Sequence, residues 1–72
     1  MTDPKFLFWL GGKIRELRLQ RGLTQIELAR QCNFEKASMS RIESGKTNIT
    51  IITLRKISIA LETEITEFFK MH

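Results

Sequence analysis

Hydrogen-bond donors gather in the middle of the chain, where cations and hydroxyls alternate with small and apolar residues: Lys36, Ser38, Ser40 and Arg41. Lysine and arginine donate to O6 and N7 of guanine, and a bidentate contact of this kind discriminates by about 1–3 kcal/mol. Serine hydroxyls bond to bases or phosphates, and the methyl group of Ala37 can contact thymine. These side chains therefore suit contact with a nucleic acid, provided that one element presents them together.

Two short helices joined by a tight turn are predicted to position these donors. Thr24 and Glu27 have the spacing of a capping box, which satisfies free N–H groups at a helix start. The next apolar residues fall on one helix face: Leu28, Ala29 and Cys32. Asn33 lies at the break, where left-handed backbone is needed and asparagine tolerates it.

The second helix is predicted from about Glu35 to Ser44. Phe34 precedes it and can pack on Met39 as a hydrophobic staple, and Gly45 can end it as a left-handed cap. The major groove of DNA accepts an α-helix, and donors near the start of that helix reach the base edges. The donors described above are the outward residues of this second helix.

Two segments resemble the helix-turn-helix domains of phage Cro and repressor proteins and of the Xre group of bacterial regulators: Thr24-Gln25-x-Glu27-Leu28-Ala29 and Ser40-Arg41-Ile42-Glu43-x-Gly45-Lys46. The resemblance continues to Phe69 and covers most of the chain. It implies an all-α fold of five helices, packed as a compact lambda-repressor-like domain over residues 1–72. It also implies double-stranded DNA as the partner.

The resemblance implies roles for individual residues. The matching base readers are Lys36, Ala37, Ser38 and Arg41, and Ser40 joins them through the chemistry of its hydroxyl. The matching phosphate contacts are Gln25, Ser44, Lys46, Thr47 and Asn48. Arg18 and Glu43 match an ion pair that ties the first helix to the recognition helix. Glu35 departs from the Ser or Thr of many relatives, since its anion suits the helix dipole but repels phosphate.

The first helix is predicted from Pro4 to Gln20, with Asp3 as its cap. Its expected buried stripe is Phe6, Leu10, Ile14 and Leu17. Three apolar residues lie off this stripe: Leu7, Phe8 and Trp9. They either form a contact patch or wrap over the C-terminal helix. Gly11 and Gly12 weaken the helix, which indicates close packing or a bend.

A fourth helix is predicted from Ile51 to Leu61, capped by Thr50. Its expected buried stripe is Ile51, Leu54, Ile57 and Leu61. Ile52 and Ile59 align on another face, so they either meet a second partner or are isolated exposed residues. In the last helix, from Ile65 to about Met71, Ile65 and Phe68 can enter the core. Phe69 is expected to face a second subunit.

Composition excludes several function classes. The chain has 72 residues and a formal charge of +4, which permits nucleic-acid binding without proving it. Cys32 is the only cysteine and His72 the only histidine, so neither a disulfide nor a metal site is expected, and no cofactor is predicted. No segment suits a membrane span or a signal peptide. Together with this, the resemblance to bacterial regulators implies a cytoplasmic location. Carboxylates do not converge, which argues against an enzyme.

The expected function is sequence-specific DNA binding by a transcriptional regulator. A homodimer would read a palindromic operator, with its recognition helices about 34 Å apart. The dimer or partner surface is expected among Ile52, Ile59, Phe69, Phe8 and Trp9. Three roles fit: a phage or plasmid repressor, a controller of a restriction–modification system, or an antitoxin that holds a toxin. The rival hypothesis is a protein-interaction module that lost DNA binding.

Overall fold

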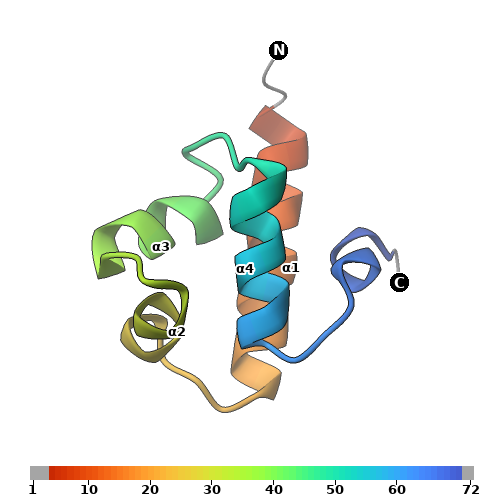
Figure 1. The fold of residues 1–72 in the computed structure, drawn as a ribbon. Helices are drawn as coiled ribbons and strands as arrows, with labels where there is room; N and C mark the ends of the chain where they lie inside the picture. Colours follow the sequence, from red (N-terminus) through yellow and green to blue (C-terminus); the bar gives the residue numbers. More distant parts are fainter. Residues whose placement is uncertain (1–3, 71–72) are drawn as a thin grey trace.

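The computed structural model describes residues 4–70, and every regular element in that range is helical (Figure 1). The elements are α1 (Pro4–Gln20), α2 (Gln25–Cys32), α3 (Lys36–Glu43), α4 (Ile51–Ala60) and η1 (Ile65–Phe69). The predicted all-α fold is confirmed, with one correction. The last element is a 3-10 helix and not an α-helix. The predicted cap Asp3 and the expected helix end Met71 lie outside the described residues.

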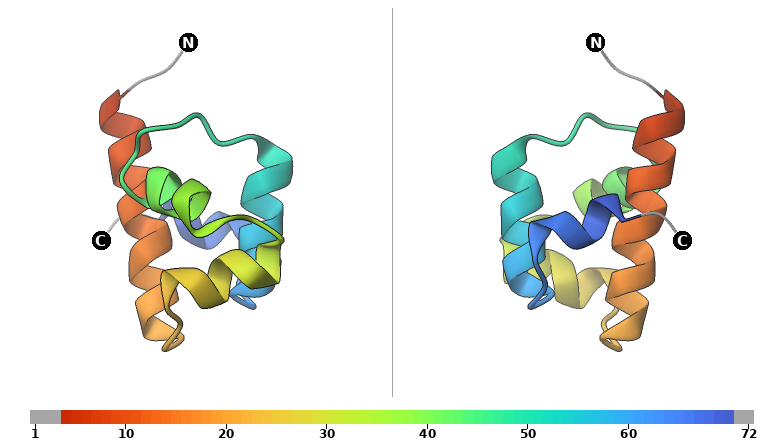
Figure 2. Two further views of the ribbon diagram at one scale, coloured as in Figure 1. Left: turned by 90° about the vertical axis from the view of Figure 1, so that its left-hand side faces the viewer. Right: turned by 90° about the vertical axis from the view of Figure 1, so that its right-hand side faces the viewer.

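Helices α1 and α4 stand apart as two uprights, and the other elements cross between them (Figure 2). Helices α2 and α3 cross on one side, where α2 packs on α4 and α3 packs on α1. The short helix η1 crosses on the opposite side and contacts both uprights. This arrangement leaves the outer surface of α3 free of other elements.

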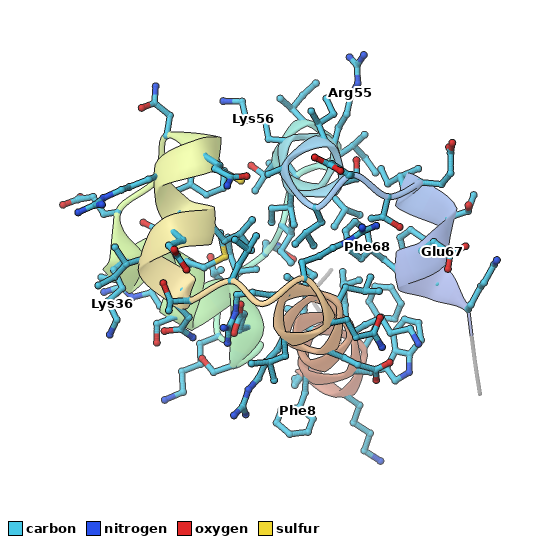
Figure 3. The ribbon with its side chains drawn as sticks, turned by 90° about the horizontal axis from the view of Figure 1, so that it is seen from below. Phe8, Lys36, Arg55, Lys56, Glu67 and Phe68 are labelled. Atoms are coloured by element: carbon cyan, nitrogen blue, oxygen red, sulfur yellow. The ribbon has the colours of Figure 1, made fainter. Side chains whose placement is uncertain are left out.

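The core fills the space between the uprights, and every element contributes to it. The largest completely buried side chains are Ile14, Leu28, Met39, Ile57, Leu61 and Phe68. Phe68 enters from η1 between α1 and α4 (Figure 3). Cys32 is buried as a free thiol, and desolvation raises its pKa, which fits the predicted role as a small apolar residue.

The turn signals predicted between α2 and α4 are confirmed. Thr24 Oγ1 accepts a hydrogen bond from the Glu27 amide at 3.1 Å, and the Thr24 amide donates to the Glu27 carboxylate at 2.8 Å. Asn33 has a φ of 63° and Gly45 a φ of 74°, both in the left-handed region. Gly45 also lies so close to the backbone of Phe8 that a Cβ added to Gly45 would be 2.6 Å from the Cα of Phe8. The loop after α3 is thereby held against α1.

The predicted stripe of α1 is partly wrong. Leu10 and Ile14 are buried, but Phe6 is exposed and Leu7 is buried in its place. Gly11 lies on the same buried face of α1 as Leu7 and packs closely against the end of α3. A Cβ at Gly11 would meet the carbonyl oxygens of Ile42 and Glu43. Gly11 therefore serves close packing, as one of the two alternatives had it.

The three apolar residues that were off the predicted stripe separate from one another. Leu7 is buried, whereas Phe8 is 70% exposed. Trp9 is half-buried against the core, and its ring lies 5.8 Å from that of Phe6. Phe6 in turn stacks on Phe69 of η1 at 6.4 Å. Of these three residues, only Phe8 remains largely uncovered in the described part of the chain and is a candidate contact residue.

The predicted stripe of α4 is also partly wrong. Thr50 caps the helix as predicted, and Leu54, Ile57 and Leu61 are buried. Ile51, however, is 69% exposed. Ile49, in the loop before the helix, packs on the core instead. The chain enters α4 from the loop at an angle that periodicity does not specify, so the loop residue fills this part of the core.

Candidate nucleic-acid interface

The outward face of α3 carries the predicted base readers. Lys36, Ala37, Ser38 and Arg41 are exposed, and Ser40 is half-buried. Lys36 points away from the body of the molecule (Figure 3). Within residues 4–70, no ion pair involves Lys36 or Arg41. Both cations are therefore available to an external acceptor.

The start of α3 is uncapped by its own side chain. Glu35 occupies the N-cap position with extended backbone, at φ −79° and ψ 154°, and makes no capping hydrogen bond. Its carboxylate is exposed beside Lys36. The predicted start of this helix is confirmed. Where many relatives have a Ser or Thr that can cap the helix, this chain has the Glu35 carboxylate, which does not cap it.

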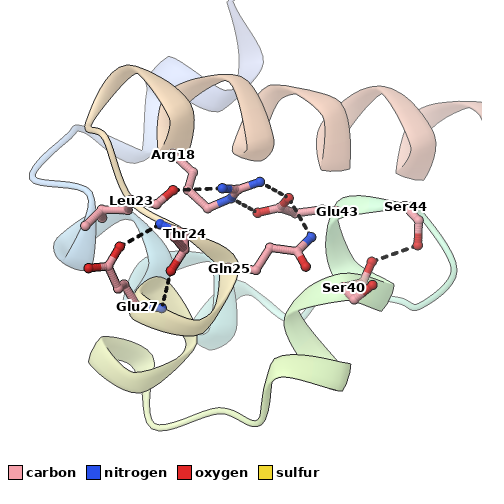
Figure 4. A network of polar contacts seen from close by, with 8 residues as sticks. All are labelled: Arg18, Leu23, Thr24, Gln25, Glu27, Ser40, Glu43 and Ser44. Atoms are coloured by element: carbon pink, nitrogen blue, oxygen red, sulfur yellow. Dashed lines mark hydrogen bonds and ion pairs between the residues drawn. The ribbon is translucent and has the colours of Figure 1, made fainter.

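The end of α3 is tied to α1 by the ion pair expected from the resemblance (Figure 4). Arg18 Nε lies 2.7 Å from Glu43 Oε2, and Arg18 Nη2 lies 3.0 Å from Glu43 Oε1. Arg18 Nη1 also donates to the Leu23 carbonyl oxygen at 2.7 Å. The two side chains are only 8% and 3% exposed. Because both partners are desolvated, the loss of one would leave an unpaired buried charge.

Gln25 joins this ion pair, which sequence analysis did not predict. Its Nε2 donates to Glu43 Oε1 at 3.1 Å (Figure 4). Side-chain amide nitrogens carry two hydrogens, so one N–H of Gln25 remains for another acceptor. This bond orients the Gln25 side chain, with its amide nitrogen toward Glu43. The sequence around Gln25 gives no signal for this contact, because Glu43 lies 18 residues further along the chain.

The residues after α3 are partly engaged with their own backbone. Ser44 Oγ donates to the Ser40 carbonyl oxygen at 2.8 Å, and Thr47 Oγ1 donates to that of Asn48 at 3.4 Å. The Ser44 hydroxyl must rotate before it can donate to a phosphate. Lys46 is exposed, and so is Asn48.

An open groove runs between α1, the start of α2 and α3. Its polar lining includes Arg15, Gln25, Lys36, Ser40 and Ser44. Arg15 is exposed and was not predicted as part of the site. The signal for it was its place three residues before Arg18, since residues at this spacing lie on the same side of a helix. The groove brings together cations and donors from three separate helices.

Fold and site together define a helix-turn-helix DNA-binding protein. The sequence profile of the helix-turn-helix family HTH_3 matches residues 14–68, and the chain belongs to this family. It is a transcriptional regulator that binds DNA through the helix-turn-helix domain. This family consists of regulators and not of enzymes, in agreement with the prediction.

Three known proteins illustrate the similarity. Control protein C.MunI of Mycoplasma sp is 36% identical over 70 residues, which are 96% of this chain and 92% of that protein. The crystal structure of the restriction-modification controller protein C.AhdI from Aeromonas hydrophila has a TM-score of 0.88 at 31% identity, and covers 90% of this chain and 98% of its own. Antitoxin HipB of Escherichia coli K12 is 35% identical over 57 residues, which are 79% of this chain and 65% of that protein.

Residues 4–70 offer neither a metal site nor a membrane-spanning helix. No cluster of three or more His, Cys, Asp or Glu side chains there could hold a metal ion. None of the described helices combines the length and the apolar character that a membrane crossing requires.

Proposed function

We propose that this regulator is the controller of a restriction–modification system and binds a palindromic operator as a homodimer. The likeness to C.MunI and C.AhdI supports this role, because it extends over nearly the whole of each chain. The observation that carries the proposal is the outward face of α3, where Lys36 and Arg41 are exposed and form no ion pair with a described residue.

The base readers in this proposal lie along α3. Lys36 and Arg41 donate to O6 and N7 of guanine, and Ala37 contacts a thymine methyl group. Ser38 and Ser40 bond to bases or to nearby phosphates. Each half of the operator is read by one α3, with a spacing of about 34 Å between the two halves. Two short reading surfaces on one dimer supply the specificity that a single domain lacks.

The phosphate contacts frame α3 on two sides. On one side, the second N–H of the Gln25 amide donates to a phosphate of the DNA backbone, and the bond to Glu43 orients this amide. On the other side lies the loop after α3, with Ser44, Lys46, Thr47 and Asn48. Arg15 adds a cation from α1, because it lines the same groove as Gln25 and Lys36. Phosphate contacts of this kind set the register and carry no sequence information.

The dimer surface in this proposal is the outer face of α4. Ile52 and Ile59 are each 64% exposed and lie seven residues apart. Arg55 and Lys56 lie between them in sequence and point outward (Figure 3). Two such faces packed by twofold symmetry bury the isoleucines.

The remaining predicted partner residues contribute less to this surface. Phe69 is 44% exposed but stacks on Phe6, and Trp9 is half-buried. Phe8 projects on the side of the molecule opposite Arg55 (Figure 3). One twofold interface cannot include both Phe8 and the outer face of α4.

The DNA-binding proposal is tested by selection from random-sequence duplexes, followed by gel-shift titration of the recovered site. The unmodified chain should recover a palindrome. The double variant Lys36→Ala with Arg41→Ala should lose site preference while it keeps the helical circular-dichroism signal. Retained preference in this variant would reject the assignment of the base readers.

The dimer is tested by size-exclusion chromatography with light scattering. The unmodified chain should elute as a dimer, and Ile52→Glu with Ile59→Glu should elute as a monomer. Ile51→Glu is the matched control, because Ile51 is equally exposed but lies about a quarter-turn away from that face. A monomer for the unmodified chain, or an unchanged dimer for the double variant, would reject this interface.

A second candidate function is that of an antitoxin. The similarity to HipB favours it, and exposed Phe8 offers an apolar contact for a toxin outside the DNA-binding face. The adjacent genes distinguish the two roles. A neighbouring restriction endonuclease and methyltransferase support the controller, and a neighbouring toxin gene supports the antitoxin.

A further inference from the structure

We infer that Glu35 is a specificity-determining residue, whose carboxylate accepts a hydrogen bond from an exocyclic amino group on a base edge. The candidates in the major groove are N4 of cytosine and N6 of adenine. The inference rests on the proposed reading of DNA by α3. It adds a hydrogen-bond acceptor with a negative charge to a surface where Lys36 and Arg41 are positively charged donors.

The carboxylate of Glu35 has no structural task in the described part of the molecule. The N-cap residues of α2 and α4, Thr24 and Thr50, each accept a hydrogen bond from their own helix. Glu35 stands at the same position of α3 and accepts none. It forms no ion pair with a described residue either, although Lys36 is its neighbour. An exposed charge without a local partner is available to a ligand.

The position of Glu35 is the one from which a recognition helix reaches bases. Residues at the N-terminal end of such a helix contact base edges, while its later residues lie further along the groove. Glu35 directly precedes Lys36, which points away from the body of the molecule (Figure 3). The two side chains therefore approach neighbouring base pairs together.

A carboxylate and an ammonium group select opposite features of DNA. An ionised carboxylate only accepts hydrogen bonds, and a lysine ammonium group only donates them. O6 and N7 of guanine and O4 of thymine are acceptors, so Glu35 disfavours them and Lys36 favours them. The amino groups of cytosine and adenine reverse this preference. Neighbouring residues of opposite character thus constrain two successive positions of a half-site.

This arrangement has an electrostatic cost that can be measured. The carboxylate repels phosphates wherever it lies, so it weakens binding to all DNA. Glu35→Ala removes both the charge and the acceptor, whereas glutamine would still accept from a base amino group and could also donate to N7 of adenine. The Glu35→Ala variant should bind random-sequence DNA more tightly than the unmodified chain and discriminate less.

The experiment is parallel selection from random duplexes with the unmodified chain, Glu35→Ala and Glu64→Ala. Glu64 is the matched control, because it is an exposed N-cap glutamate of η1 that also makes no capping bond. Glu35→Ala should lose about tenfold preference at one position of each half-site, with the others unchanged. The lost base identifies the source of the amino group as cytosine or adenine. Glu64→Ala should select the unmodified site.

Three outcomes would overturn the inference. If Glu35→Ala selects the same bases with the same preference as the unmodified chain, Glu35 acts only as a repelling charge. If Glu35→Ala and Glu64→Ala relax the site equally, the effect belongs to net charge. If the unmodified chain selects no site, the proposed function fails, and the inference fails with it. Melting temperatures within a degree or two of each other show that folding is unaffected.

Discussion

The two helices of the motif are held in place in opposite ways. Helix α2 is fixed at its start by a local capping box between Thr24 and Glu27, three residues apart. Helix α3 has no side-chain cap at its start and is fixed at its end, where Glu43 binds Arg18 across 25 positions of sequence. The carbonyl oxygens of Ile42 and Glu43 also lie against Gly11 of α1.

The two kinds of anchoring leave the starts of the two helices in different states. A local cap satisfies the N–H groups of α2 without help from the rest of the fold. Anchoring at the far end leaves the first turn of α3, with Glu35 and Lys36, exposed to the surroundings. The exposed start of the helix is thus separated from the end that carries its long-range polar contacts.

The largest expected effect is the loss of the anchor at the end of α3. Arg18→Ala should destabilise the fold by about 3–5 kcal/mol, because it leaves the Glu43 carboxylate buried and unpaired. Arg15→Ala should change stability by less than about 0.5 kcal/mol, since Arg15 is exposed. Urea unfolding followed by circular dichroism measures both, and equal midpoints would contradict the importance of this pair.

The next effect concerns the close contact between α1 and α3. Gly11→Ala should destabilise by about 1–3 kcal/mol, because its Cβ would lie 2.6 Å from the Glu43 carbonyl oxygen and the backbones must separate. Gly12→Ala should stabilise by about 1 kcal/mol, since it has nothing within 4 Å and alanine favours a helix. Opposite shifts of the unfolding midpoint for adjacent glycines are the test, and shifts of the same sign would refute it.

The caps themselves can be compared directly. Thr24→Ala should cost about 1 kcal/mol, because it removes the acceptor for the Glu27 amide. Glu35→Ala should change stability by less than about 0.5 kcal/mol, since Glu35 accepts no hydrogen bond from α3. Thermal unfolding of the two variants measures the difference. A loss for Glu35→Ala as large as that for Thr24→Ala would show that the start of α3 is capped after all.

The smallest effect is a pH dependence confined to the α2 cap. The Thr24 amide, followed by its hydroxyl, lowers the pKa of the Glu27 carboxyl below its ordinary value of 4.5. A carboxyl with a lowered folded-state pKa stabilises the fold above its unfolded pKa, and this contribution is lost as the pH falls through the folded pKa. The melting-temperature difference between the unmodified chain and Glu27→Gln should therefore be largest near neutral pH and shrink below 4.5. A difference that grows on acidification would contradict this sign.

Sequence alone determined the features whose cause is local. The capping box at Thr24, the left-handed turns at Asn33 and Gly45, and the bounds of α1 to α3 all follow from a few adjacent residues. The order of these signals also indicated the helix-turn-helix motif and the outward donors on α3. Such features were predictable because the residues that produce them are neighbours in the chain.

Tertiary structure decided which of several equivalent faces is buried. Periodicity allowed Phe6 in the core of α1, but the contact of Gly11 with the end of α3 turned Leu7 inward. The path of the loop before α4 placed Ile49 on the core and left Ile51 exposed. The bond between Gln25 and Glu43 and the groove that includes Arg15 likewise join separate helices. These features depend on the angles at which helices meet, and those angles are set by all the packed side chains together, so no short segment of sequence contains them.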